Sequence, residues 1–173
     1  MKKLLTLSLI FLMWACSSSP SIQQYYVEKS QDPSFLVMDI PTSILGIDQA
    51  TLNDEEREAL ASFQKFNILL FRKTDENQNQ FDNELDTVRG ILDNKTFDPL
   101  LVLSDPEYSG KLVLQGSLDR PDEIIFFGSS IQGFIVARLI GRKMQVDKAM
   151  LLAGVLQREG AMERAAKHLG QMF

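Results

Sequence analysis

The sequence contains only one cysteine, Cys16, and one histidine, His168, among its 173 residues. Structural zinc sites are built from cysteine and histidine ligands, and triad hydrolases rely on a histidine base. No Gly-x-Ser-x-Gly elbow occurs, and the glycine-containing stretch at residues 128–133 lacks the lysine that follows in a P-loop. We therefore expect a protein that is not an enzyme and that uses no cofactor.

Basic residues are also in short supply. The chain carries 18 Lys and Arg against 23 Asp and Glu, a formal net charge of −5. Nucleic acids and anionic membrane surfaces attract proteins with an excess of positive charge. We therefore expect no nucleic-acid partner and no basic membrane-binding surface. Hydrophobic residues make up 45% of the chain, which is enough for the core of one ordinary domain.

The most apolar stretch, residues 4–14, is too short to cross a bilayer, which requires about 20 residues. Two lysines precede this stretch, and the small residue Ala15 follows it directly before Cys16. A positive start, a short apolar run and a small residue at the cleavage position are typical of a secretory signal peptide. We predict a signal peptide over residues 1–15.

The four residues ending at Cys16 resemble a bacterial lipobox, whose cysteine is lipidated with acyl chains such as palmitate. Met13 and Trp14 stand where lipoboxes usually carry an aliphatic and a small residue. A cleaved signal with an unmodified cysteine and an uncleaved apolar anchor are the alternatives. We favour lipidation of Cys16, because an exported protein would otherwise keep one unpaired thiol. Ser17, in place of aspartate, resembles lipoproteins sent to the outer membrane, with the domain facing the periplasm.

Residues 16–33 are polar and show little periodicity, so they are predicted to form a lipidated flexible tether. The Tyr-Tyr-Val tripeptide at residues 25–27 interrupts this segment. It either docks on the domain or lies at the membrane interface, and we favour docking. The domain itself is expected over residues 34–157. An amphipathic helix over residues 158–173 would pack on the domain, fray or bind a partner, and we favour packing.

The first half of the domain predicts a strand, a helix and a second strand. The apolar run at residues 35–40 is ended by Pro41, and residues 66–71 form a second such run. Between them, Asn53 is placed to cap a helix, with Glu56 at the reciprocal position of a capping box. This order is a βαβ-type unit, in which the two strands can be parallel.

A second helix is predicted from Phe81, Leu85, Val88 and Leu92, which recur at helical spacing. Gly90 weakens this helix by about 1 kcal/mol relative to alanine. From residue 97 onward the period changes to two. The strands expected there cover residues 100–104, 111–118, 123–129 and 133–141.

Short connections make these four strands antiparallel neighbours, and a helix over residues 146–156 follows them. Leu112 and Leu114 point to one side and Lys111 and Gln115 to the other, so one side of the sheet is expected to be wet. The fold class is α+β. We expect a largely antiparallel sheet of about six strands with a βαβ-type N-terminal unit, helices packed on one face and a C-terminal helical segment.

The end strands at residues 123–127 and 134–141, followed by a short helix, resemble those of a known family. Over residues 35–156 the chain resembles small bacterial lipoproteins catalogued as domain of unknown function 4252. The resemblance implies a lipid-anchored envelope protein, and it supplies no catalytic residues.

One segment has the oxygen ligands of a calcium loop. Asp75, Asn77 and Asn79 stand at alternate positions, and Asp86 would be the twelfth ligand of such a loop. Gln80 occupies the place of the required glycine, and an aspartate replaces the final glutamate. We favour a polar turn that leads into the following helix, and expect no metal.

Two functional hypotheses follow. The first is a lipid-anchored envelope protein with a non-catalytic binding, structural or sensing role, held to the membrane through its N-terminal lipid and partnered by an envelope protein. The alternative is a periplasmic carrier that binds a small ligand or calcium on the concave face of the sheet.

Overall fold

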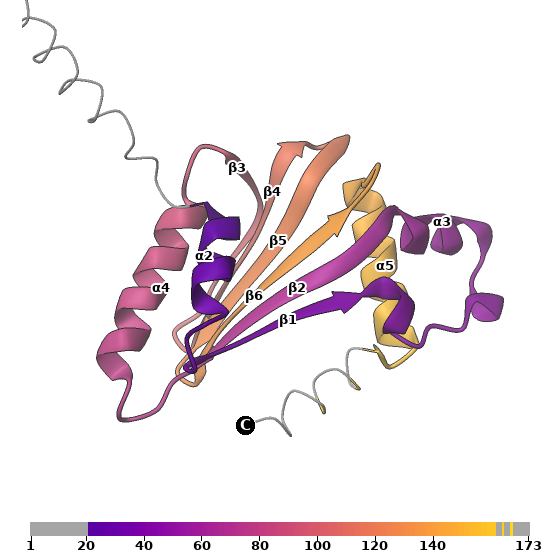
Figure 1. The fold of residues 1–173 in the computed structure, drawn as a ribbon. Coiled ribbons are helices and arrows are strands. Elements are labelled where there is room, and N and C mark those ends of the chain that lie inside the picture. Colours follow the sequence, from indigo (N-terminus) through magenta and orange to yellow (C-terminus); the bar gives the residue numbers. More distant parts are fainter. Residues whose placement is uncertain (1–20, 162–163, 165–166, 168–173) are drawn as a thin grey trace, which may run out of the picture.

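The computed structural model describes residues 21–161, 164 and 167, and its centre is a six-stranded antiparallel sheet (Figure 1). The order of strands across the sheet is β1-β2-β6-β5-β4-β3. This arrangement confirms the predicted α+β class. The strands are β1 (Phe35–Pro41), β2 (Phe63–Arg72), β3 (Phe97–Ser104), β4 (Tyr108–Ser117), β5 (Arg120–Ser130) and β6 (Gly133–Gly141).

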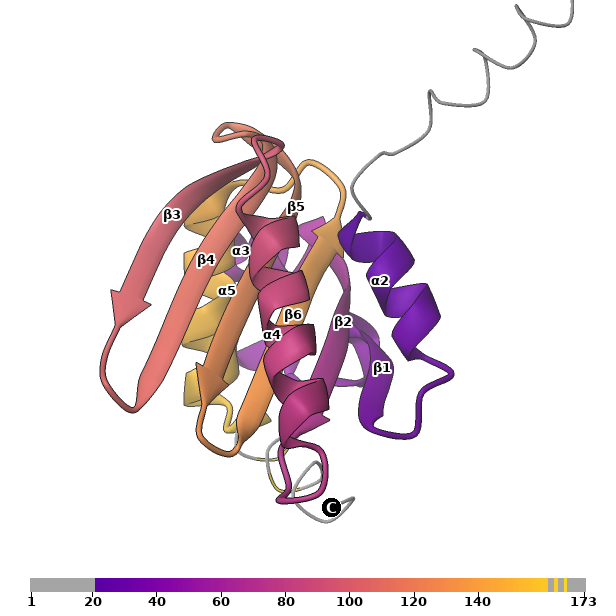
Figure 2. The same cartoon turned by 90° about the vertical axis from the view of Figure 1, so that its left-hand side faces the viewer.

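Helices cover both faces of the sheet. The helices are α2 (Ile22–Lys29), α3 (Asp54–Ser62), α4 (Gln78–Leu92) and α5 (Val146–Arg158), with 3-10 turns η2 (Thr42–Ile44) and η3 (Gln49–Thr51). Figure 2 shows α2 and α4 in front of the strands and α5 behind them. The expectation that helices pack on one face was therefore wrong. The reason lies in strands such as β2, whose two sides are both apolar, so that exposing either side to water would raise the free energy of the folded state.

The N-terminal strands are antiparallel, which corrects the suggested parallel βαβ arrangement. Phe35 of β1 lies opposite Phe71 of β2, and Pro41 lies opposite Lys65. Parallel neighbours require a connection that crosses the sheet. Helix α3 instead packs beside α5 at the end of the strands, so the chain turns back along β1 (Figure 1).

Residues 22–29, expected within the flexible tether, form the helix α2. The Ser21 hydroxyl accepts a hydrogen bond from the Gln24 backbone N–H at 3.2 Å, and the Gln24 side chain accepts one from the Ser21 N–H at 3.0 Å. Ile22, Tyr25 and Tyr26 are buried. The predicted docking of the tyrosines is confirmed, and the polar residues between them form the outer face of the helix.

Glu84 of α4 holds α2 in place. Its two carboxylate oxygens accept hydrogen bonds from the Tyr25 hydroxyl at 2.8 Å and from the Lys29 ammonium at 2.7 Å. Burial, together with the hydrogen bond to Glu84, raises the pKa of Tyr25, so its hydroxyl stays protonated as a donor.

Aromatic rings fill the core beneath α2 and α4. Phe71 stacks on Phe134 with ring centroids 5.4 Å apart, and Phe35 meets Phe71 edge-on at 4.9 Å. Phe81 from α4 closes the cluster against both stacked rings. Such pairs stabilise a core by about 0.5–1.5 kcal/mol each beyond the area that they bury.

The core beneath α3 and α5 is smaller and lies at the other end of the strands. Leu152 and Leu156 of α5 pack with Phe63 and Met144, and with the partly buried Leu139 of β6. Val113 and Leu114, adjacent residues on opposite sides of β4, are both fully buried. The expected wet side is therefore absent at this end of β4, because helices lie over both faces.

The predicted leader, including Cys16, lies outside the described residues. So does most of the predicted helix over residues 158–173. Ala161 packs into the α5 core, and the Arg164 guanidinium donates to the backbone carbonyls of Glu159 and Leu45 at 2.7 and 3.2 Å. None of the helices in the described part of the chain is both long enough and apolar enough to span a membrane.

Gly90 lies in the last turns of α4, and a Cβ placed there would meet nothing within 4 Å. Gly90→Ala should therefore raise the free energy of unfolding by about 0.5–1 kcal/mol, because alanine loses less backbone entropy on folding. Urea unfolding monitored by circular dichroism measures the change. A lower stability for the variant would contradict the open surroundings of Gly90.

The capping box of α3 is confirmed, and it also joins α3 to α5. Glu56 accepts hydrogen bonds from the Asn53 N–H at 2.9 Å and from the Arg158 guanidinium at 2.6 Å. Both hydrogen bonds lower the pKa of the Glu56 carboxyl, and the one from Arg158 has the larger effect. Its contribution to stability is therefore complete above the unfolded-state pKa of about 4.3, and is lost as the pH falls through the lower folded-state value.

Glu56→Gln should accordingly lower stability at pH 7 more than at pH 3, which flattens the acid side of the stability curve. Urea unfolding at both pH values measures this difference. Glu55→Gln is the matched control, since Glu55 is exposed in the same helical turn. An equal loss at both pH values would show that the charge of Glu56 is not what stabilises the contact.

Candidate functional site

The four candidate calcium ligands do not converge. The side-chain oxygen of Asn77 accepts a hydrogen bond from the Thr74 N–H at 2.7 Å, and its amide nitrogen donates to the Arg72 carbonyl at 2.9 Å. Asp75 is exposed in the turn before α4. Asn79 and Asp86 both lie in α4, about 10 Å apart along its axis. Among the described residues, no group of three or more His, Cys, Asp or Glu is placed to hold a metal ion.

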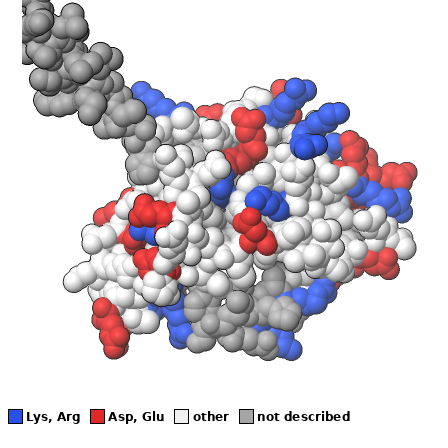
Figure 3. Space-filling view, viewed as in Figure 1, with Lys and Arg blue, Asp and Glu red and all other residues white. Residues whose placement is uncertain are grey.

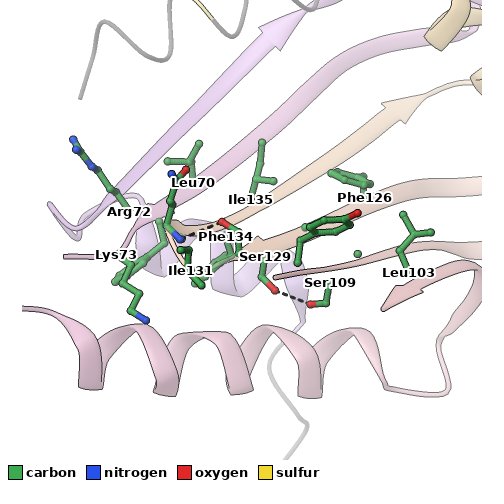
Figure 4. Close-up of a pocket in the computed structure, with 17 residues that line it drawn as sticks. Leu70, Arg72, Lys73, Leu103, Ser109, Phe126, Ser129, Ile131, Phe134 and Ile135 are labelled. Atoms are coloured by element: carbon green, nitrogen blue, oxygen red, sulfur yellow. Dashed lines mark hydrogen bonds between the residues drawn. The ribbon is translucent and has the colours of Figure 1, made fainter. Parts of the chain in front are cut away.

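The first candidate site is an open hollow of about 840 Å³ at the end of the sheet where β2 and β5 finish, which we call the apolar groove. Figure 4 shows Leu70, Ile135, Phe126 and Leu103 on the side of the sheet away from α4. Within the described structure, α3 and α5 pack over the opposite end of this face. Its principal apolar side chains are Leu70, Leu103, Tyr108, Phe126, Ile131 and Ile135.

The sequence makes this hollow by placing two glycines opposite each other. Gly110 of β4 pairs with Gly128 of β5, so no side chain rises from the middle of this surface. A Cβ at Gly128 would lie 3.2 Å from the ring of Phe126 and 3.5 Å from Ile135. The two glycines therefore let the larger apolar side chains, the Phe126 ring above all, lie close against the backbone of β4 and β5.

The groove continues into an exposed sheet edge. In the described part of the chain, β3 pairs only with β4, and Leu101, Val102 and Leu103 are 51%, 60% and 47% exposed. Proteins usually protect such edges with charges, proline or a bulge. Here Pro99 and a register shift protect only the start of β3. The open part of the edge presents unpaired backbone groups beside apolar side chains.

Acidic residues flank this edge. Residues 97–110 contain three acidic residues, Asp98, Asp105 and Glu107, and no lysine or arginine. On the face drawn in Figure 3, which is the side of β1 and not that of β3, acidic and basic residues are interspersed rather than gathered in a patch of one sign. The edge of β3 therefore combines an uncharged centre with negative ends.

The second candidate site lies on the α2/α4 face, at the opposite end of the strands, and we call it the polar groove. It encloses about 610 Å³ beside α2. Asp39, Asn67 and Arg138 stand opposite one another across β1, β2 and β6. Lys65 and Glu123 belong to the next row of the same face.

These side chains form two ion pairs. Arg138 donates from Nε and Nη2 to Oε2 of Glu123, at 2.8 and 2.6 Å, and each residue is 7% exposed. Lys65 donates to Asp39 at 2.7 Å, and the Asn67 amide donates to the other Asp39 oxygen. The hydrogen bond from Lys65 lowers the pKa of Asp39 despite some desolvation, so Asp39 stays ionised.

Tyr26 of α2 forms one wall of the polar groove. Its hydroxyl donates to the backbone carbonyls of Val136 and Asn67, at 2.6 and 3.0 Å. The Arg138 guanidinium lies over its ring, 5.2 Å from the centroid. Burial raises the pKa of Tyr26, which keeps the hydroxyl a donor. Helix α2, which lies in a segment predicted to be a tether, thus helps to position the Arg138–Glu123 pair through Tyr26.

Sequence reasoning assigned no role to these charges. Arg138 shares its side of β6 with Phe134 and Val136, both buried, so its position in the two-residue period predicts a buried charge. Glu123 opens a similarly apolar run in β5. A charge on the buried side of a strand was therefore the available signal, although its partner could not be identified without the strand register.

The sequence model of a family described as Domain of unknown function (DUF4252) matches residues 25–152. No curated protein sequence and no solved structure matches the chain. The matched region includes every described strand and reaches from Tyr25 in α2 to Leu152 in α5.

Proposed function

We propose that this chain, which belongs to the family of domain of unknown function 4252, is a lipid-anchored envelope protein that binds a partner protein without catalysis. The observation that carries the proposal is the exposed, uncharged edge of β3 together with the adjoining apolar groove. Large exposed apolar patches of this kind mark interaction sites in soluble domains.

The partner that fits this surface is an extended protein segment. The unpaired backbone groups of β3 can be satisfied by a strand that lies alongside it, as in other cases of β-augmentation. Alternate side chains of the added strand would extend the apolar surface beside Leu101 and Leu103. Basic residues at the ends of the segment would complement Asp98, Asp105 and Glu107.

The lipid anchor proposed at Cys16 would hold this surface close to the membrane. Ser21 caps α2, so five backbone steps separate the anchor from the folded domain. Even fully extended, they span only about 18 Å. The partner would therefore be another component of the envelope near the same membrane, which we place at the periplasmic side of the outer membrane.

A defined peptide tests the binding site. A synthetic peptide of alternating valine and threonine, flanked by two lysines at each end, is added to the full-length ¹⁵N-labelled chain in detergent. We expect amide shifts confined to β3, β4 and the apolar groove, and weaker shifts when glutamate replaces the lysines. Leu103→Lys should weaken binding at least about tenfold. Met150→Lys is the control, because Met150 is 72% exposed on α5.

Two results would contradict the proposal. One is an equal loss of binding in the two lysine variants. The other is binding of a fatty acid such as laurate in the apolar groove with no shift from the peptide, which would favour the carrier alternative.

The anchor has a separate test. Intact mass spectrometry of the membrane-extracted protein should show a mature chain that begins at Cys16 and carries acyl chains. Cys16→Ser should lose that modification and the association with membranes. An unmodified wild-type chain that still begins at Met1 would rule out the lipid anchor and leave the peptide test unaffected.

A further inference from the structure

The Arg138–Glu123 pair lies in a place where stability does not require it. Both residues are 7% exposed, and their neighbours on the same face include Ile125, Val136 and Ile140. Taking two charges out of water offsets much of their attraction, so well-packed apolar residues are often as stable or more stable than a buried ion pair. The pair therefore calls for a role other than stability.

Two atoms of the pair are available to a ligand. Nη1 of Arg138 and Oε1 of Glu123 make no hydrogen bond within the described structure. No fully buried side-chain nitrogen or oxygen in that part of the chain lacks a partner, so each of these two atoms keeps some exposed surface. Since both residues line the polar groove, it offers a strong donor and a strong acceptor from one rigid pair.

The charges of the groove select against ionic ligands. Both of its cations are already paired, Lys65 with Asp39 and Arg138 with Glu123. An added anion would meet three carboxylates against two cations that are already paired, and an added cation would find only one carboxylate outside these pairs, that of the exposed Asp122, where such a contact contributes little. A neutral ligand depends on neither contact.

The other residues that line the polar groove indicate the chemical character of this ligand. The side-chain amides of Gln23 and Gln115 can each donate and accept, and Val27, Val37 and Ile140 supply apolar contact. A saccharide has the matching character, because its hydroxyls donate and accept while its ring carbons are apolar. The volume of about 610 Å³ lies within the usual range for small-molecule sites.

We propose that the polar groove binds a neutral, hydroxyl-rich ligand of the saccharide class. Nη1 of Arg138 donates to one hydroxyl, and Oε1 of Glu123 accepts from another. The groove lies on the opposite face and at the opposite end of the strands from the apolar groove. Saccharide binding is therefore independent of the proposed partner site, and both can be occupied together.

The test uses the full-length ¹⁵N-labelled chain in detergent with five probes. They are the tetrasaccharides of N-acetylglucosamine, β-1,4-linked glucose and α-1,4-linked glucose, with inorganic phosphate and spermidine as the ionic probes. We expect at least one tetrasaccharide to shift amides of Arg138, Glu123 and Gln115, and neither ionic probe to do so. No shift there with any tetrasaccharide, or shifts there with phosphate or spermidine alone, would overturn the proposal.

Variants assign the binding to the pair. Glu123→Leu combined with Arg138→Met should stay folded and weaken saccharide binding at least about tenfold. Gln115→Leu, at the rim of the groove, should weaken it by a smaller factor, so the proposal stays testable if the double variant does not fold. Arg89→Met, at an exposed position of α4, is the control. Unchanged affinity in both groove variants would overturn the assignment.

Discussion

Ile22→Asp is expected to lower the free energy of unfolding by about 3–5 kcal/mol, because it places a carboxylate without a partner in an apolar core. Ile22 is 2% exposed and packs in the aromatic cluster beneath α2 and α4. The same substitution at Val27, 65% exposed on the same helix, should change stability by no more than about 0.5 kcal/mol.

Urea unfolding of the two variants, monitored by far-ultraviolet circular dichroism, measures the difference between their free energies of unfolding. Equal stabilities would mean that α2 is not part of the folded domain, and that the tether extends to residue 33 as its composition suggests. A large loss at Ile22 alone would place the start of the fold at Ser21. That outcome limits the distance between the proposed anchor and the folded domain, since only residues 17–20 then separate Cys16 from the cap of α2.

Glu123→Leu alone is expected to cost about 3–5 kcal/mol, because it leaves the Arg138 guanidinium buried without its counter-ion. Adding Arg138→Met to this variant should recover most of the loss, since the buried charge is then gone as well. The recovery is the informative result. It would show that each charge is tolerated in the core only because the other is present. It would also show that the pair does not stabilise the fold more than apolar residues would.

A double-mutant cycle in urea, with Arg138→Met as the second single variant, measures the coupling between the two side chains. Additive losses would contradict the pairing seen in the structure. Lys65→Met provides a comparison, because Lys65 and Asp39 form the more exposed pair of the same groove. Its cost should be at most about 1 kcal/mol, as is usual for exposed ion pairs.

The elements predicted most accurately are those whose signals are local. Asn53 and Glu56 form the capping box of α3 as expected, because both partners lie within one helical turn. The four-three-four spacing from Phe81 correctly predicts α4, and the two-residue period correctly predicts β6. The family resemblance is likewise confirmed, over residues 25–152.

The wrong predictions concern contacts between distant segments. The predicted tether includes α2 because only three buried side chains, Ile22, Tyr25 and Tyr26, form the apolar side of this short helix. The residues around them are mostly polar, so the segment resembles a linker in composition. The single covered face was inferred from β4 in isolation, although Val113 and Leu114 are buried on opposite sides of it. Both depend on what packs against the segment, and the amino-acid pattern of the segment does not contain that information.

The sequence by itself determined the α+β class, the presence of all six described strands and the starts of α3 and α5, because backbone periodicity and capping depend on neighbours along the chain. It also predicted the signal peptide and the lipid at Cys16, which lie outside the described residues. Only the tertiary structure decided the strand order, the two covered faces and both grooves. Glu123 and Arg138 meet across β5 and β6, and Gly110 meets Gly128 across β4 and β5, because strand register brings them together. That register is set by burial on both faces of the sheet at once.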